Sequence, residues 1–245
     1  MPNGTAGTVD IVVDVYHDND ADFIALKKSG IVGVIHKASQ GMKFKDDKYH
    51  ERRKTADEMK FLWGAYHFSS ADDVEEQVKN FMDAIQFDKQ RDAKTLLSLD
   101  FEPSGSVKKR DGKGKVVLGP DNKPVMVKLP NMTLDQANHF VELIHEKAGR
   151  WPVVYGGGLL RASVEHATSA IPLARCPLWY ARYRNTPKEL PTHVWPATKE
   201  WPASYALWQY TDGEDGPEPH GISGQGYDRD TFYGTEDELK EKWPF

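Results

Sequence analysis

A short apolar run that ends in two acidic residues decides the fold: Leu96-Leu97-Ser98-Leu99-Asp100-Phe101-Glu102. A run of this length and composition is typical of a buried β-strand. Side chains alternate along a strand, so Asp100 and Glu102 share one face while Leu99 and Phe101 occupy the other. We therefore expect a strand whose end presents two carboxylates to the same side of a sheet.

Similar apolar runs recur on both sides of this one, separated by helix-like segments. The other expected strands lie at residues 9–15, 31–35, 61–66, 152–155, 178–181 and 205–210, with a short last one around 227–228. Helices are expected at about 20–29, at 134–148 behind a Thr133/Gln136 capping box, and from Thr235, where Glu238 completes another. About eight strands alternating with helices, without a linker, predict an α/β fold: a single-domain, closed or nearly closed (β/α) barrel over residues 1–245.

Residues 103–130 interrupt this pattern. They are rich in Gly, Lys and Pro, and they contain two turn signals, Asp111-Gly112 and Asp121-Asn122-Lys123-Pro124. We expect an exposed, hairpin-like insertion beside the face of the barrel on which the strands end. Its Lys108-Lys109-Arg110 run is expected to be a solvated loop.

Composition narrows the class of protein. The net charge of −5, from 32 basic and 37 acidic residues, provides no basic surface for nucleic acid or a membrane, and no apolar run is long enough for a membrane span. The single cysteine, Cys176, excludes an internal disulfide and is expected in the core. No export signal is recognised in Met1–Thr5, which has neither a basic nor an apolar region.

The paired carboxylates carry the chemistry that we expect. Two acids held close together cannot both ionise freely, so one pKa rises and that group can donate a proton near neutral pH. Cleavage of a glycosidic bond needs such a donor beside a negative group. A solvated rim, a cap or a metal ligand is the open alternative for Asp100 and Glu102.

Two further acids are predicted to join them. Asp14 ends an apolar strand, with Asp10 and Val12 expected on its face, and Asp228 follows a glycine-rich loop near the other terminus. In a closed barrel the first and last strands are neighbours, so Asp14 and Asp228 should converge. The alternative for Asp228 is a turn residue. Aromatic residues at strand ends fit a sugar site, or else fill the barrel: Tyr66, Phe68, Tyr155, Trp179, Tyr183, Trp208 and Tyr210.

An ordered set of motifs gives the chain a family resemblance. The matching segments are Asp14-Val15-Tyr16-His17, Lys37-Ala38-Ser39-Gln40-Gly41, Gly64-Ala65-Tyr66-His67-Phe68, Asp100-Phe101-Glu102, Pro177-Leu178-Trp179-Tyr180-Ala181-Arg182-Tyr183, Trp208-Gln209-Tyr210-Thr211, Gly221-Ile222-Ser223-Gly224 and Tyr227-Asp228-Arg229-Asp230-Thr231-Phe232. They span nearly the whole chain, and they resemble the family 25 glycoside hydrolases, the Chalaropsis-type lysozymes. The chain departs from the family pattern at Gln40, where Glu is usual, at Asp230, where Asn is usual, and in the insertion.

The resemblance implies a TIM-like (β/α) barrel of modified or irregular form. It also implies an N-acetylmuramidase that cleaves β-1,4 bonds after N-acetylmuramic acid in peptidoglycan, with retention. Glu102 would be the general acid and Asp100 its partner, either as a nucleophile or as the stabiliser of attack by the sugar's own acetamido group, with Asp14 and Asp228 in the surrounding set. The substrate-binding residues would be Tyr66, Phe68, Tyr155, Trp179, Arg182, Gln209 and Lys37. No metal and no cofactor are expected. The expected binding partner is the glycan strand of peptidoglycan, and the protein is expected to be a monomer that acts outside the cell or during phage lysis.

Three other readings stay open. One is a metal-dependent barrel hydrolase that uses His17, His36 or His67 with Asp14, although their spacing matches no common ligand motif. The others are a chitin-type N-acetylglucosamine glycosidase and a non-catalytic wall-binding module. Gly156-Gly157-Gly158 is expected to be a tight strand-to-helix turn, with a phosphate cradle as the alternative.

Overall fold

The computed structural model of the protein describes residues 7–245. The opening Met1–Thr5, in which no export signal was recognised, lies outside the described residues. None of the helices within 7–245 is both long and apolar enough to span a membrane.

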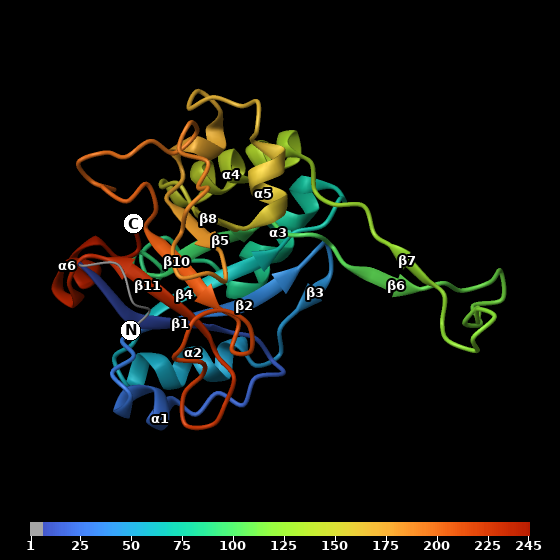
Figure 1. The fold of residues 1–245 in the computed structure, drawn as a ribbon, viewed down its shortest axis with the longest axis horizontal. Coiled ribbons are helices and arrows are strands. Elements are labelled where there is room, and N and C mark those ends of the chain that lie inside the picture. The colour runs from blue at the N-terminus through green and yellow to red at the C-terminus, as the bar shows by residue number, and fades with distance from the viewer. Residues whose placement is uncertain (1–6) are drawn as a thin grey trace.

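Eight strands within the described residues close into a barrel in the order β1–β2–β4–β5–β8–β9–β10–β11 and back to β1 (Figure 1). The barrel strands are β1 (Thr8–Val15), β2 (Gly33–Gln40), β4 (Leu62–Phe68), β5 (Leu96–Asp100), β8 (Val153–Gly156), β9 (Leu178–Ala181), β10 (Leu207–Thr211) and β11 (Asp228–Tyr233). Neighbours are parallel except β11, which runs antiparallel to both β1 and β10. The two-residue strand β3 (Phe44–Lys45) pairs with the end of β2. The predicted modified (β/α) barrel is confirmed.

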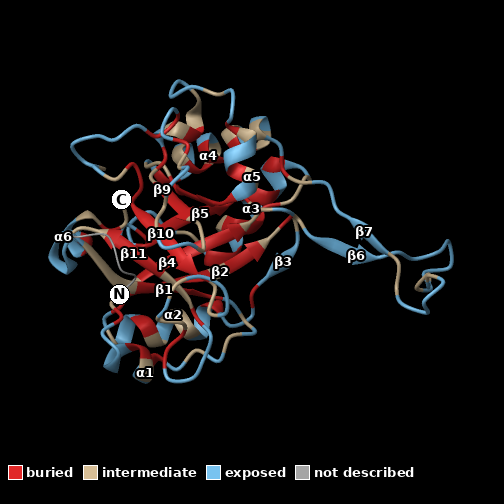
Figure 2. Cartoon of the chain, viewed as in Figure 1, coloured by how far each residue is buried: buried red, intermediate tan, exposed pale blue. Residues whose placement is uncertain are grey.

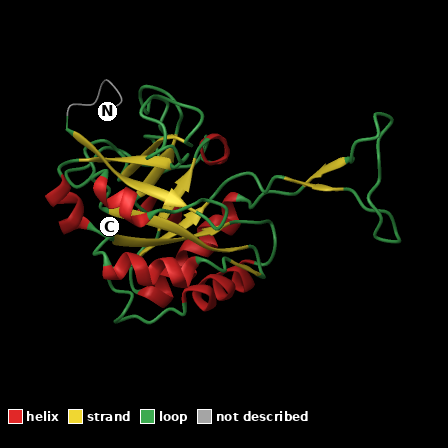
Figure 3. Ribbon diagram, turned by 90° about the horizontal axis from the view of Figure 1, so that it is seen from below, coloured by secondary structure: helices red, strands yellow, loops and turns green. Residues whose placement is uncertain are grey.

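Helices pack around the outside of the barrel (Figures 1 and 3). They are α1 (Phe23–Lys28), α2 (Tyr49–Glu58), α3 (Val74–Ile85), α4 (Leu134–Ala148), α5 (Gly158–Ser163), the 3₁₀ helix η1 (Pro172–Arg175) and α6 (Glu236–Lys242). Both predicted capping boxes are present, at Thr133 and at Thr235. The glycine run forms the expected tight turn, because β8 ends at Gly156 and α5 begins at Gly158.

Alternation along the strands divides the core into two layers. Val12, Ile35 and Phe232 point into the barrel, whereas Val13 and Val34 pack outward against the helices. The interior is crowded: a Cβ atom at Gly64 would lie 3.0 Å from Cγ2 of Ile35, so a larger residue there would push β2 and β4 apart.

The C-terminal segment closes one end of the barrel. Leu239 of α6 and Trp243 belong to the buried interior cluster, and the indole N–H of Trp243 donates to the Trp63 carbonyl oxygen over 3.2 Å. Trp63 lies at the start of β4, so the C-terminal segment fills the end of the barrel at which the parallel strands begin. The opposite end, where those strands finish, is left to hold a site.

Three local expectations were wrong or too narrow. β11 has six residues, not the short strand expected around Tyr227. β5 ends at Asp100, although the Phe101 N–H still donates to the Tyr155 carbonyl oxygen over 2.9 Å. Asp10 was expected on the same face as Asp14. A shift in register between Asp10 and Val12 instead lets Asp10 pair with Arg229 at 2.7 Å.

Residues 103–130, called the arm from here on, project away from the barrel (Figures 1 and 3). Within the arm, β6 (Ser106–Lys108) pairs antiparallel with β7 (Met126–Lys128). Figure 2 shows the contrast in burial: the barrel strands are buried and both arm strands are exposed.

Candidate active site

Acidic side chains converge where the parallel strands of the barrel finish. Asp14 is near the end of β1, Asp100 ends β5, and Asp228 begins the antiparallel β11, which places it directly opposite Asp14. They share a cleft of about 210 Å³, whose lining residues are Asp14, Tyr16, Lys37, Tyr66, Phe68, Asp100, Glu102, Tyr155, Trp179 and Asp228. The predicted convergence of Asp14 with Asp228 from opposite ends of the chain is confirmed.

Asp100 and Glu102 both reach this cleft because strand alternation continues beyond the end of β5. Leu99 and Phe101 are fully buried in the outer layer, as expected. Asp100 is only 5% exposed, and its Oδ1 has no hydrogen-bond partner within residues 7–245. Burial raises the pKa of both carboxyls, and the charge of Glu102 raises the pKa of Asp100 further. The pair therefore retains a proton closer to neutral pH than free acids do.

Lys37 supplies a positive charge to the pair. Its ammonium group lowers the pKa of Asp100 against the effects of burial and Glu102. Lys37 is held in place by Gln40, whose Oε1 accepts its hydrogen bond at 2.7 Å, and by the Phe68 ring, 4.8 Å away. Gln40 is one of the departures from the family pattern. A neutral amide here positions the lysine without competing with Asp100 for its charge.

Gln209 connects the acids on the other side of the cleft. Its amide donates to Asp14 Oδ2 at 2.6 Å and to Asp228 Oδ2 at 3.5 Å. The hydroxyls of Tyr155 and Tyr183 donate to its Oε1 at 2.7 and 2.9 Å, which fixes the amide with its N–H groups toward the acids. Gln209 is buried and lies beneath the cleft rather than among the residues that line it.

The pKa values of this second acid pair are also raised. Burial is the largest cause for Asp14, and the charges of Asp228 and Asp230 add to it. For Asp228, burial and the charges of Asp212 and Glu102 raise the pKa to about 7. A group that titrates as close to neutrality as Asp228 can hold or release a proton during a reaction.

Asp230 is a buried acid for which the sequence analysis had predicted no role. Its Oδ1 accepts a hydrogen bond from the Trp179 indole at 2.5 Å, while its Oδ2 has no hydrogen-bond partner within residues 7–245. Burial, with the charge of Asp228, raises its pKa well above the ordinary value. Asp230 is two residues beyond Asp228 on β11, so strand alternation was the signal that placed both on one face.

Six of the seven predicted aromatic residues divide into two groups, and the seventh, Tyr183, lines a neighbouring hollow. Tyr66, Phe68, Tyr155 and Trp179 line the cleft, and Tyr16, which was not predicted, joins them at 39% exposure. Trp208 and Tyr210 belong to the outer core instead. The signal for Tyr16 was its position two residues after Asp14, where the first strand ends.

Arg182 lies outside this cleft. It faces a separate hollow with Tyr183 and Arg184, and its guanidinium pairs with Glu189 at 3.0 Å. The histidines considered for a metal site contact other protein groups: His17 the Asp46 carboxylate, His36 the Lys37 carbonyl, and His67 the side chains of Ser39 and Gln77. None of the three is among the residues that line the cleft.

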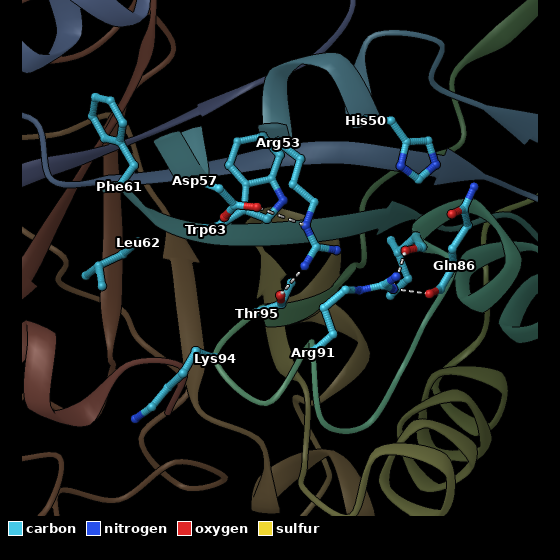
Figure 4. Close-up of a pocket in the computed structure, with 11 residues that line it drawn as sticks. His50, Arg53, Asp57, Phe61, Leu62, Trp63, Gln86, Arg91, Lys94 and Thr95 are labelled. Carbon is cyan, nitrogen blue, oxygen red and sulfur yellow. Dashed lines mark hydrogen bonds and ion pairs between the residues drawn. The ribbon is translucent and has the colours of Figure 1, made fainter. Parts of the chain in front are cut away.

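A second cavity lies at the opposite end of the barrel, next to the first residues of β4 (Figure 4). Its wall includes Arg53, Arg91 and Lys94, and Figure 4 shows Arg53 directed toward Thr95 and Asp57. It contains none of the candidate site residues. The acid beside it, Asp92, is held by both arginines, at 2.5 and 2.9 Å.

The chain is similar to known proteins in both sequence and fold. The model of the glycosyl hydrolases family 25 matches residues 13–218. Among solved structures, the muramidase from Trichobolus zukalii is 21% identical over 96% of this chain and 97% of that chain, with a TM-score of 0.66. The muramidase from Acremonium alcalophilum is 24% identical over 93% and 95%, with a TM-score of 0.64. At these identities the structures establish a shared fold. A comparison with curated proteins found no match.

Proposed function

The chain belongs to the glycosyl hydrolases family 25, and is therefore a glycoside hydrolase; from this premise we propose that it cleaves the glycan strands of peptidoglycan. The bond that we assign is the β-1,4 linkage between N-acetylmuramic acid and N-acetylglucosamine. Two similar structures are named as muramidases. The observation that carries the proposal is the presence of Asp100 and Glu102 in one aromatic-walled cleft.

Glu102 is proposed as the general acid. It must hold a proton and deliver it to the leaving glycosidic oxygen, and burial raises its pKa in the direction that this role requires. Asp100 is its partner, and the ammonium of Lys37 favours the ionised form of Asp100. Both pKa values are raised, so the pair as a whole retains a proton, and Lys37 is the neighbouring charge that opposes placing it on Asp100. Asp14 and Asp228 complete the set on the other side of the cleft.

The aromatic wall supports a sugar ligand. Rings present apolar faces to the C–H groups of a pyranose, and the Tyr66 and Tyr155 hydroxyls add polar contacts. Tyr66, Phe68, Tyr155, Trp179 and Lys37 are the binding residues that we assign to the cleft. Gln209 acts from beneath by holding Asp14, and Arg182 contacts substrate only where the glycan extends into the neighbouring hollow.

We favour a substrate-assisted route. The carbonyl oxygen of the sugar's 2-acetamido group attacks the anomeric carbon, Glu102 protonates the leaving oxygen, and water then opens the cyclic intermediate with net retention. Asp100 orients the acetamido group and stabilises its developing positive charge. A glycan whose acetamido group at the cleaved sugar is replaced by hydroxyl should resist hydrolysis. Cleavage at the normal rate would favour direct attack by Asp100.

Digestion of purified peptidoglycan tests the function itself. The new reducing ends are analysed by mass spectrometry after borohydride reduction. Muramic acid at those ends supports the proposal. Glucosamine ends would assign the other linkage, as for a chitin-type enzyme, and wall binding without any new reducing ends would indicate a binding module.

A further inference from the structure

The arm is anchored at the rim of the cleft. It begins at the residue after Glu102, and Ser104 donates its backbone N–H to Asn131 Oδ1 at 3.0 Å, which joins the two ends of the arm. From this anchor the arm extends away from the barrel (Figures 1 and 3). Any ligand held by the arm is therefore held by a segment whose base lies beside the proposed acid.

The charge of the arm is opposite to that of the remaining chain. Seven of its residues are basic and two are acidic, so it carries a net charge of +5. Because the whole chain carries −5, the remaining residues together carry −10. Within residues 7–245, none of the arm's basic side chains takes part in an ion pair. The positive charge of the arm is thus available to an external partner.

The two strands of the arm place their charged side chains, Lys108 and Lys128, on one face, which also carries Met126. In the β6–β7 register, Lys108 lies opposite Met126, and Ser106 lies opposite Lys128. Residues that face each other across a ladder share one face, so both lysines lie together on one side. Val107 and Val127, 47% and 43% exposed, form the pair on the other side. Beyond β6, continued alternation places Arg110 with Lys108 and Lys109 with Val107, so the basic face gains Arg110 and the valine face gains one lysine.

The composition of the arm selects among possible partners. It contains no Phe, Tyr or Trp, so it offers no ring on which a neutral sugar could stack, and it lacks the aromatic anchors common in segments that bind membrane interfaces. Six of its seven positive charges are lysine ammonium groups, compact point charges suited to phosphate. A flexible chain of phosphates complements a row of exposed lysines, and its binding is driven by the release of counterions.

We propose that the basic face of the arm binds an anionic polymer with phosphodiester groups that is attached to the wall glycan, and so holds the cleft on its substrate. The inference rests on the proposed function, because it places this polymer on the same wall that the cleft cleaves. It assigns to Lys108, Arg110 and Lys128 a contact with polyanion, separate from the contacts that the cleft makes with the glycan.

The test compares two sets of three substitutions that remove the same charge. The arm variant is Lys108→Gln, Arg110→Gln and Lys128→Gln. The control is Lys54→Gln, Lys79→Gln and Lys240→Gln on α2, α3 and α6, three lysines whose side chains are 49–80% exposed. The probe is poly(glycerol phosphate), titrated at several salt concentrations.

We expect the arm variant to bind poly(glycerol phosphate) at least about tenfold more weakly than the wild type, and the control to stay within about twofold. The slope of log K against log salt concentration should fall by roughly one for each lost contact. Hydrolysis of a soluble, polymer-free glycan is measured in parallel, since none of the substituted residues lines the cleft. If no protein cleaves that glycan, the proposed function fails, while the binding result still decides the role of the arm.

Three results would overturn the inference. The first is equal binding of the polymer by the arm variant and the wild type. The second is binding of the wild type to phosphatidylglycerol vesicles but not to poly(glycerol phosphate), which would make the arm a membrane contact. The third is loss of polymer binding in Val107→Ser with Val127→Ser while the arm variant still binds, which would assign the contact to the apolar face.

Discussion

Acidic side chains are buried at both ends of the barrel, but their neighbours carry opposite charges at the two ends. At the end where the parallel strands begin, the Asp92 side chain has no exposed surface and is met by Arg53 at 2.5 Å and Arg91 at 2.9 Å. At the end where those strands finish, Asp14 and Asp100 are 7% and 5% exposed and have other acids as neighbours. Burial is shared by the two regions, and only the partners differ.

The difference in partners reverses the sign of the pKa shift. Burial disfavours ionisation of Asp92, but hydrogen bonds from Arg91, from the backbone N–H of Asp88 and from Arg53 outweigh it and lower the pKa. In the cleft, burial is reinforced by neighbouring carboxylates, and the pKa values rise. The ionised form of Asp92 therefore stabilises the folded state. For the cleft acids the ionised form is disfavoured in the folded state, so their burial lowers the free energy of unfolding at neutral pH.

The largest effect is expected from Glu102→Gln, which preserves shape but cannot donate the proton. Loss of a general acid typically costs roughly 10²–10⁴-fold in rate, so nearly all turnover on soluble glycan should disappear. The unfolding midpoint in urea should change little, because the substitution removes a charge that burial disfavours. Glu165→Gln, at an exposed position, is the control. Near-wild-type turnover in Glu102→Gln would exclude Glu102 as the acid.

Asp92→Asn should show the reverse pattern, a loss of stability without a loss of catalysis. Removing one partner of a buried ion pair costs about 3–5 kcal/mol, and the variant leaves Arg53 and Arg91 with a neutral amide. Urea unfolding at pH 7 measures the free energy. Asp57→Asn is the matched control: Asp57 also contacts Arg53, at 3.9 Å, but it is 63% exposed, and surface pairs contribute at most about 1 kcal/mol. Equal losses in the two variants would contradict the comparison.

The sequence predicts an element of this fold well when residues within that element carry the signal for it, and poorly when the signal comes from tertiary contacts. The β-branched runs of β1 and β2 identify strands without any tertiary information, and the capping box at Thr133 marks the start of α4. Helix α2 buries only Tyr49 and Ala56, so its apolar pattern is too sparse to predict a helix. Helix α3 buries Val74, Val78, Phe81 and Ile85 at helical spacing, so its sequence did contain the signal for a helix that was not predicted.

The candidate site also has one part that a single strand predicts and another that depends on contacts between distant strands. Alternation in a single strand was enough to place Asp100 and Glu102 together. The hydrogen bond from Gln209 to Asp14 spans 195 positions of sequence, and that from Trp179 to Asp230 spans 51. These contacts depend on how β9, β10 and β11 align after the barrel closes. The sequence predicted Gln209 as part of the site, but its place beneath the cleft required the register.

The two regions should also respond to pH with opposite signs. The folded-state pKa of Asp228 is about 7, above the ordinary 3.8, so the folded state binds more protons, and stability contributed by this group is lost as pH rises from about 4 to 7. Asp228→Asn should reduce that loss, as measured by urea unfolding at both pH values. For Asp92, whose pKa is lowered, stability is present above the ordinary value and is lost as pH falls through the lowered one. An Asp228→Asn profile parallel to that of the wild type would show that this acid is not linked to folding.

The smallest effect is expected from Asp230→Asn, which separates the geometric role of this residue from its charge. An asparagine keeps the oxygen that accepts the Trp179 hydrogen bond, so the aromatic wall should stay in place. The change removes one of the three neighbouring charges, those of Asp228, Asp230 and Asp100, that raise the pKa of Asp14. Asp14 should therefore titrate at a lower pH, which carbon NMR of the aspartate carboxyls can follow, while turnover at the optimum pH changes by less than about tenfold.

A small effect fits a group that acts through its neighbours, because the carboxylates that face the cleft are unchanged. A loss of turnover as large as that of Glu102→Gln, with Trp179 still in place, would instead make the Asp230 proton part of the reaction.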